Sequence, residues 1–261
     1  MADHTDNWNP GTYAKFRDLR LRPALDLLAQ VPELPDGDVI DLGCGNGPVG
    51  AALKTRFAGR RLIGVDSSSN MLEAADQTGM YDDLQLQDIA TWNPDTAPAL
   101  IFSNAALHWL PDHDILLPGL VRLLALNGVL AVQMPRQFEA PSHVLLRQCA
   151  TDLWPDRFDW HSYAPPVLPP EKLVNILSPM GKPDIWEASY VQVLDAAGQG
   201  HPVRRFTIST AAQPILAKLS KAEQVEFLMH YDTALTMAYP VLDGKVIFPF
   251  LRQFCILRKK G

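Results

Sequence analysis

An acid and three glycines lie at alternate positions in this chain, and their types and spacing are typical of a ligand-binding turn. They follow the apolar pair Val39-Ile40, and they are Asp41, Gly43, Gly45 and Gly47. Glycine permits the positive φ angles of a tight turn and lets a ligand touch bare backbone. A buried strand, a glycine turn and a helix form the unit that cradles a nucleotide in doubly wound α/β folds. The run therefore predicts a nucleotide-containing cofactor, against the simpler reading of a glycine turn without a ligand.

The spacing of the glycines distinguishes two classes of cofactor. Dinucleotide-binding folds carry G-x-G-x-x-G, whereas here the third glycine comes one residue early and Pro48 occupies the last glycine position of that pattern. The run instead resembles motif I of the class I S-adenosylmethionine-dependent methyltransferases. This resemblance implies S-adenosyl-L-methionine as the cofactor, and it disfavours a dinucleotide oxidoreductase.

Further apolar segments end in polar side chains, as the strands of such a sheet would. The segment 61–66 ends in Asp66, near the offset from the turn at which an acid meets ribose hydroxyls. Strands predicted at 84–86 and 99–102 precede Asp88 and Asn104. Ligands bind at the carboxyl ends of parallel strands, so these polar groups are expected at one site. Asp88 taken alone could equally be a turn residue.

The order of the elements predicts an α/β fold with a doubly wound, mostly parallel sheet. The class I resemblance implies seven strands in a Rossmann-like arrangement, with the last strand antiparallel and a helical lid inserted before it. We expect three regions, which are an N-terminal helical leader (1–37), the cofactor-binding α/β core (38–153) and the remainder (154–261). The remainder should contain a loop over the active site (154–170), the sixth strand (184–194), the helical lid (197–238) and the last strand (252–257).

Composition fits a cytoplasmic enzyme that acts on a small molecule. The net charge of -6 argues against broad binding to nucleic acid or anionic membranes. No apolar run reaches membrane-spanning length, and the polar residues 1–7 do not look like a signal peptide. The three cysteines are dispersed without the spacing of metal ligands. We therefore expect no metal, nucleic-acid or membrane partner, and the oligomeric state stays open.

Several segments beyond motif I make the chain similar to the trans-aconitate 2-methyltransferase family along its whole length. They are residues 8–10, 22–24, 64–68, 109–113 and 128–135. Members of this family transfer a methyl group from S-adenosylmethionine to a carboxylate of trans-aconitate. The resemblance implies an O-methyltransferase that esterifies a small anionic carboxylic acid.

The resemblance also implies which residues bind the cofactor. The three motif I glycines would pass its methionine part, and Asp41 would orient the turn or meet the amino group through water. Asn104 would place its backbone near the sulfonium. Arg22 is expected either to meet the methionine carboxylate or to belong to a solvated helix face.

The adenosine part of the cofactor would be held by a second set of residues. Asp66 would bind the ribose, with Ser67 beside it. Asp88 and Ile89 would flank the adenine, and Met71 would pack on the ring.

For the acceptor, the resemblance and the charges of the chain point to Tyr13, His108, Trp109, Arg136, His143, Gln213 and Arg252. Two of these positions depart from the family, which has an acid in place of Arg136 and an arginine in place of Gln213. Arginine makes bidentate charged contacts with carboxylates that glutamine cannot make. We therefore predict weak use of trans-aconitate and activity on another small acid.

No catalytic acid or base is predicted, because a carboxylate acceptor is already ionised at neutral pH. Its alignment with the methyl group would then determine the rate. An amine, phenol or alcohol acceptor would need a base, for which the candidates are His108, His113 and His143. Two other functions stay open: a methyltransferase acting on a different small-molecule or carrier-bound acceptor, and a module that binds S-adenosylmethionine without turnover.

Overall fold

The computed structural model describes residues 17–160 and 167–261, which form two compact units. The described residues of the first unit are 17–135, 167–188 and 252–261. Those of the second unit are 136–160 and 189–251.

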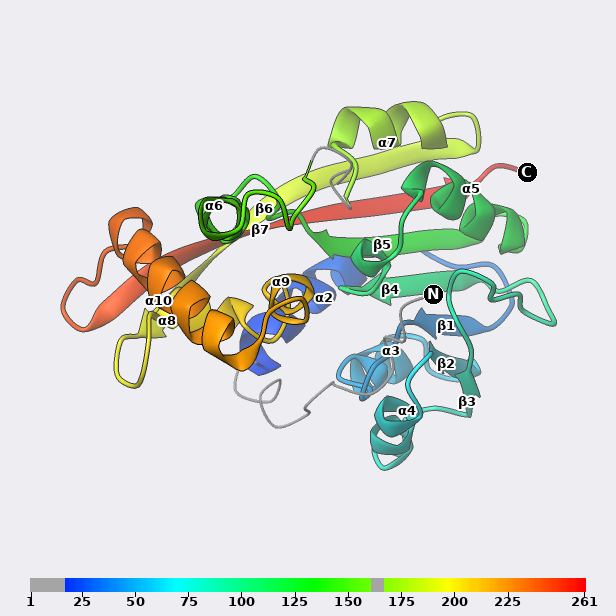
Figure 1. Cartoon of the computed structure of the whole chain (residues 1–261). Coiled ribbons are helices and arrows are strands. Elements are labelled where there is room, and N and C mark those ends of the chain that lie inside the picture. Colours follow the sequence, from blue (N-terminus) through cyan, green and yellow to red (C-terminus); the bar gives the residue numbers. More distant parts are fainter. Residues whose placement is uncertain (1–16, 161–166) are drawn as a thin grey trace. The chain divides into compact units, whose positions relative to one another are not determined.

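One seven-stranded sheet has the order β3-β2-β1-β4-β5-β7-β6 (Figure 1). Its strands are β1 (Val39–Leu42), β2 (Leu62–Asp66), β3 (Asp83–Leu86), β4 (Leu100–Asn104), β5 (Val129–Pro135), β6 (Gly181–Asp195) and β7 (Lys245–Lys259). The first five strands are parallel, and β7 runs antiparallel to β5. These features confirm the predicted doubly wound α/β fold with an antiparallel last strand.

The strand order fixes where a ligand would bind in the first unit. The chain builds outward from β1 to β3 and then returns to the other side of β1 with β4. A crevice opens at such a reversal, outside the carboxyl ends of the two central strands. The glycine turn follows β1, and Asn104 ends β4. The topology therefore brings both to the same crevice.

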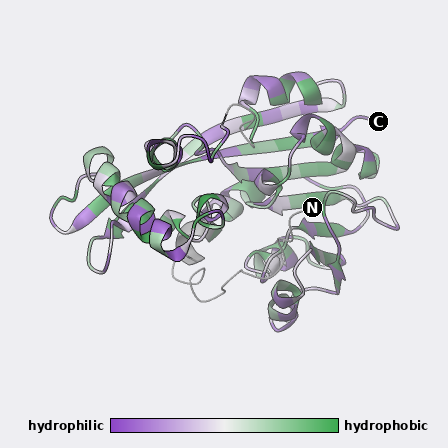
Figure 2. Cartoon of the chain, in the orientation of Figure 1, coloured by the Kyte–Doolittle hydropathy of each residue, from purple (hydrophilic) through white to green (hydrophobic). Residues whose placement is uncertain are grey.

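The helices of the first unit are α2 (Arg17–Gln30), α3 (Gly50–Arg56), α4 (Ser69–Asp76), the 3-10 turn η1 (Leu107–Trp109), α5 (His113–Leu123) and α7 (Pro170–Leu177). Alternate residues of the central strands, such as Ile40 and Leu130, form a buried cluster with leucines of α5 and α7. The hydropathy colouring follows this pattern, with apolar residues concentrated along the strands (Figure 2). Burial of this apolar face is the main force that holds the sheet and its helices together.

The second unit contains α6 (Pro141–Leu153), α8 (Pro202–Thr207), α9 (Gln213–Leu216), α10 (Lys221–Ala238) and the adjoining parts of β6 and β7. Its core is aromatic, because Phe206, Tyr239 and Phe250 pack around the fully buried Phe248. Helix α10 begins with a capping box in which Ser220 and Glu223 each bond the other's backbone N–H.

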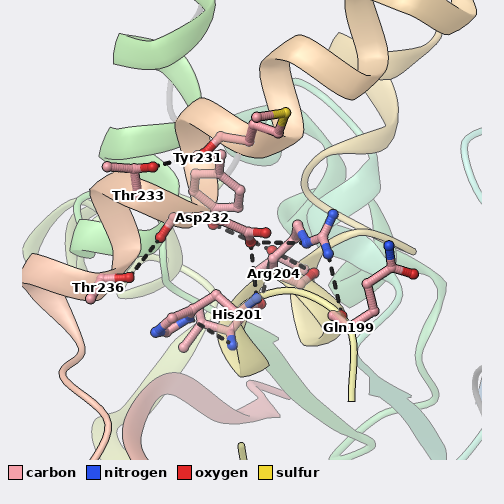
Figure 3. Close-up of polar contacts among 10 residues, drawn as sticks. Gln199, His201, Arg204, Tyr231, Asp232, Thr233 and Thr236 are labelled. Carbon is pink, nitrogen blue, oxygen red and sulfur yellow. Dashed lines mark hydrogen bonds and ion pairs between the residues drawn. The ribbon is translucent and has the colours of Figure 1, made fainter. Parts of the chain in front are cut away.

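Polar contacts of α10 tie it to its neighbours within the second unit (Figure 3). The carboxylate of Asp232 accepts the backbone N–H of His201 at 3.0 Å and pairs with Nε of Arg204 at 2.9 Å. At the preceding position on α10, the fully buried Tyr231 donates its hydroxyl proton to the carbonyl of Ser142 on α6 at 2.9 Å. These bonds join α10 to the start of α8 and to α6.

The last strand is longer than predicted, because it begins at Lys245 rather than near Arg252. Its first half alternates buried Val246, Phe248 and Phe250 with exposed residues that include Pro249. Pro249 precedes the part of β7 that pairs with β5, which runs from Arg252 to Arg258. Proline is tolerated in a strand where its missing N–H is not needed for pairing. The predicted loop 154–170 also ends at a helix that the sequence did not indicate, α7. None of the described helices combines the length and the apolar character needed to cross a membrane.

We predict that Tyr231→Phe lowers the free energy of unfolding by about 0.5–1.5 kcal/mol, because it removes the buried hydrogen bond from the Tyr231 hydroxyl to the carbonyl of Ser142. Chemical denaturation of the two proteins would measure the difference. Thr236→Ala on the same helix is the control. Its exposed hydroxyl bonds only the preceding turn of α10, and we expect a change within about 0.5 kcal/mol.

Candidate functional site

The glycine turn after β1 is anchored to β2 and open on one side. The N–H groups of Gly43 and Cys44 both donate to the carbonyl of Val65, at 2.8 and 3.0 Å. Gly43 and Gly45 have φ angles of 76° and 54°, in the region that favours glycine. A Cβ on Gly43 would overlap the Cβ of Ala106, whereas a Cβ on Gly45 would meet no atom of the described residues within 4 Å. A ligand could therefore approach the backbone at Gly45 directly.

Asp66 at the end of β2 holds this turn in place. Its carboxylate accepts the N–H of Gly45 at 2.9 Å and the N–H of Ser68 at 3.0 Å. Each carboxylate oxygen can accept a second hydrogen bond, so both oxygens keep capacity for the hydroxyls of a ribose. Ser67 is exposed beside Asp66, and Met71 is half-buried on α4, whose N-cap is Ser68.

Asp41 is buried beneath the turn with 2% of its surface exposed. Its Oδ2 accepts the hydroxyl of Tyr81 at 2.7 Å. Burial raises the pKa of Asp41 to about 7, the Tyr81 bond opposes this rise, and the nearby charge of Asp66 adds to it. The sequence analysis missed Tyr81, which lies between α4 and β3. The signal was indirect, because an acid buried at a strand end needs a donor from somewhere in the chain.

Asp88 and Ile89 follow β3. Asp88 is exposed, and its Oδ1 accepts the N–H of Ala90 at 2.9 Å, so it forms a turn. Ile89 is half-buried and packs against the core cluster, with its Cδ1 near Gly43. Ile89 thus lies beside the glycine turn, while the carboxylate of Asp88 has a local structural partner.

Asn104 and Gln133 are paired residues on β4 and β5, so their side chains project from the same face of the sheet. Gln133 is fully buried. Both polar atoms of its amide, and Oδ1 of Asn104, have no hydrogen-bond partner within the described part of the chain. Ala105, the next residue, has a φ of 52°, which is strained for alanine. Unpaired buried polar atoms and local strain are both typical of binding sites. The sequence analysis missed Gln133, although a glutamine inside an apolar strand was a visible signal.

The segment after β4 carries three further candidates. Trp109 is 49% exposed, and its ring centroid lies 4.6 Å from that of His108. His113 is buried, and its Nε2 bonds the carbonyl of Leu107 at 2.9 Å. Burial lowers the pKa of His113, so it is neutral at neutral pH. His113 therefore holds η1 in place through this bond.

Two arginines of the first unit occupy contrasting environments. The side chain of Arg22 is 77% exposed and lies 3.8 Å from the carboxylate of Asp26, one turn further along α2. This placement agrees with a solvated helix face, and contact of Arg22 with the cofactor stays a prediction. Arg252 is buried with 4% of its surface exposed, and it pairs with Pro135 at the carboxyl end of β5. Tyr13 lies outside the described residues.

The remaining acceptor candidates belong to the second unit. Arg136 is half-buried. Nδ1 of His143 lies 3.0 Å from the hydroxyl of Ser142, and burial, with the charge of Arg147, lowers the pKa of His143 to about 4. Gln213 is exposed on α9, and its amide donates to the carbonyl of Ile208 at 2.6 Å.

The residues gathered in the first unit fit a cofactor that has a ribose and a cationic amino-acid part. The open backbone at Gly45, the two acids and the unpaired Oδ1 of Asn104 supply acceptors for hydroxyl and ammonium groups. No group of His, Cys, Asp and Glu within residues 17–160 and 167–261 could hold a metal ion.

Comparison with known sequences identifies close relatives. A family model described as a methyltransferase domain matches residues 13–178. A trans-aconitate 2-methyltransferase of Methylobacterium radiotolerans is 40% identical, with 99% of each chain covered. The enzyme of the same name from Variovorax paradoxus is 37% identical, covering 98% of this chain and 99% of the relative.

Solved structures share the fold at low sequence identity. The YcgJ protein of Bacillus subtilis is 14% identical with a TM-score of 0.59, covering 92% of this chain and 99% of its own. Phosphoethanolamine N-methyltransferase 2 of Haemonchus contortus, solved with S-adenosyl-L-methionine, is 16% identical with a TM-score of 0.51, covering 92% of this chain and 53% of its own. These likenesses show the class of fold.

We predict that Asp66→Ala weakens binding of S-adenosylmethionine by about 1–3 kcal/mol, the scale for leaving polar partners unpaired. Isothermal titration calorimetry would measure the affinity. Asp76→Ala is a matched control, because Asp76 is an exposed acid at the end of α4. Equal affinity of Asp66→Ala and the unmodified protein would remove Asp66 from the cofactor site.

Proposed function

This chain belongs to the trans-aconitate 2-methyltransferase family, and we propose from that premise that it esterifies a carboxylate of a small organic acid. It is a methyltransferase that uses S-adenosyl-L-methionine. The observation that carries the proposal is the row of groups at the carboxyl edge of the first unit. There, an open glycine turn held by Asp66 lies near Oδ1 of Asn104 and the amide of Gln133, which have no hydrogen-bond partner among the described residues.

The cofactor would extend along this edge from β2 toward β4. Asp66, with Ser67 beside it, would hold the ribose at the end of β2. Met71 and Ile89 would contact the adenine, and Asp88 would lie near it. The glycine turn and Asp41 would hold the methionine part, and the backbone of Asn104 would lie near the sulfonium. The sheet order β2-β1-β4 supports this direction.

The acceptor would then lie on the β5 side of Asn104. Gln133 is the register partner of Asn104, and Arg252 is buried on the neighbouring strand β7. The amide of Gln133 could donate to one carboxylate oxygen. The guanidinium of Arg252 would supply the positive charge that an anionic acid requires. His108 and Trp109 follow Asn104 closely and are proposed as further walls of this site.

The chemistry requires positioning more than proton transfer. When bound, the cofactor supplies a methyl group on a positively charged sulfur, which an oxygen nucleophile can displace in line. A carboxylate is ionised at neutral pH and needs no base. The chain's own residues would align the acceptor with the methyl group and remove water from it. Alignment of this kind can contribute a large part of the rate acceleration. Tyr13, Arg136, His143 and Gln213 remain proposed acceptor residues.

Two further proposals concern the cellular location of the protein and its binding partners. We infer a cytoplasmic location, which is consistent with three buried cysteines that are all free thiols. The proposed partner is the small acid itself, and the negative net charge argues against nucleic acid as a substrate.

We predict that the unmodified protein uses trans-aconitate weakly and that Gln213→Arg improves its use. A charged hydrogen bond to a carboxylate is worth about 1.5–3 kcal/mol, which is roughly a tenfold or greater gain in kcat/KM. Transfer of labelled methyl from the cofactor to a panel of small acids measures both proteins. Gln213→Lys is the control, because it adds charge without the bidentate geometry. Efficient methylation of trans-aconitate by the unmodified protein would refute the prediction and would show that other arginines bind its carboxylates.

The pH dependence separates a carboxylate acceptor from other nucleophiles. With cofactor and acceptor saturating, kcat should be nearly constant from about pH 6 to 8.5, because the acceptor stays ionised throughout. Initial rates across this range measure it. A steep rise governed by one group near pH 7 would instead indicate a histidine base and a different acceptor.

Gln133→Leu tests where the acceptor binds. The substitution removes a buried unpaired amide, whose burial costs about 1–3 kcal/mol, so the variant should be at least as stable as the unmodified protein. We expect a higher KM for the acceptor with an unchanged Kd for S-adenosylmethionine. Gln192→Leu is the matched control, because Gln192 is also buried and both atoms of its amide lack a hydrogen-bond partner within the part of the chain that the structure describes. An unchanged KM in Gln133→Leu would place the acceptor elsewhere.

A further inference from the structure

The ring of Tyr81 fits a space that three glycines leave empty. A Cβ on Gly47 would lie 3.0 Å from the ring of Tyr81, and Cβ atoms on Gly50 and Gly64 would each lie 2.9 Å from it. These glycines come from the turn, from the start of α3 and from β2. Side chains at those positions would displace the ring. The packing therefore fixes where the hydroxyl of Tyr81 points, which is at the carboxylate of Asp41.

The other surroundings of Asp41 disfavour its negative charge. Among residues 17–160 and 167–261, the ionisable groups near it are Tyr81, Cys44 in the turn and Asp66 on β2. Its register neighbour on β4 is Phe102, which is fully buried and apolar. Burial and the charge of Asp66 both oppose ionisation, whereas the bond from Tyr81 favours it. The thiol of Cys44 stays neutral, because burial raises its pKa.

We propose that Tyr81 is a positioning residue that holds Asp41 in its ionised form to receive the cationic amino group of the cofactor. This inference rests on the proposed cofactor site and adds a residue that motif I does not contain. The two acids would attract the positive end of the cofactor, and Asp41, whose burial raises its pKa to about 7, would change its charge near neutral pH. Binding of the cofactor would therefore release a proton from Asp41.

The pH dependence of cofactor affinity follows from this arrangement. Below about pH 7 a growing fraction of Asp41 is protonated in the free protein, so the affinity for S-adenosylmethionine falls. Tyr81→Phe keeps the ring in its space and removes only the hydroxyl. The pKa of Asp41 in the variant should rise by about one unit, since the lost hydrogen bond stabilised the charged form.

The test is the ratio of the Kd of Tyr81→Phe to that of the unmodified protein, measured by calorimetry from pH 6 to 9. Titration of the cofactor's own amino group cancels in this ratio. A one-unit shift predicts a ratio of roughly ten at pH 6, about five at pH 7 and near one at pH 9. A hydroxyl that only supports the fold would give the same ratio at every pH, and that result would overturn the proposal. When both proteins also carry Asp41→Asn, the ratio of their Kd values should not depend on pH.

The protein without cofactor gives an independent measurement. A folded-state pKa above the unfolded value means that the native state holds the proton more tightly, so stability falls as pH rises from about 4 to 7. In Tyr81→Phe this fall should extend to about pH 8, and in Asp41→Asn it should be absent. Identical pH profiles of stability in Tyr81→Phe and the unmodified protein would also refute the proposal. Failure of the unmodified protein to bind S-adenosylmethionine would instead refute the cofactor site itself, so the two failures are distinguishable.

Discussion

The carboxylate of Asp66 is the interaction on which the rest of the site depends. One oxygen accepts the N–H of Gly45 in the turn after β1, and the other accepts the N–H of Ser68 at the start of α4. A single side chain thus joins two neighbouring strand ends, and a left-handed glycine turn that could adopt many conformations is held in one. The ordering entropy of that turn is lost during folding rather than during ligand binding, which is the general advantage of a preorganised site. The same two bonds orient the carboxylate and leave each of its oxygens able to accept one more hydrogen bond.

The parts of the fold that the sequence predicts well are those with an unmistakable apolar pattern. β2 lies within one residue of its predicted bounds, because a continuous run of buried residues leaves little choice of secondary structure. The first half of β7 was missed, because Pro249 and exposed Ile247 interrupt a strand that alternates between buried and exposed positions. Helix α7 follows a proline-rich stretch and has proline at its first position, where proline is favourable. The prolines that led us to predict a loop are therefore equally compatible with the start of a helix.

The site was predictable only where one short motif carries it. The glycine turn and Asp66 are close in sequence and have characteristic spacing. Tyr81 and Gln133 have neither property, because their importance comes from what lies opposite them: a buried acid in one case and a register partner in the other. Such partners are set by the pairing of strands and by packing across the sheet, which a single sequence does not state. The hydrogen bonds of Asp88 and Gln213 to nearby backbone are equally invisible in a sequence, and each gives the side chain a local structural partner.

The charges along the carboxyl edge of the first unit explain how one site could hold two ligands of opposite charge. In sheet order, the edge presents the acids Asp66 on β2 and Asp41 on β1, then the neutral amides Asn104 on β4 and Gln133 on β5, and then buried Arg252 on β7. A cationic cofactor is favoured at the acidic end and an anionic acceptor at the basic end. Acids placed directly beside the acceptor would repel it, and arginine beside the sulfonium would repel the cofactor, so neutral amides suit the strands between them. Amides left unpaired in this position cost stability. Binding of an acceptor could recover that cost through hydrogen bonds to the fully buried amide of Gln133, whereas Asn104 beside it is only partly buried.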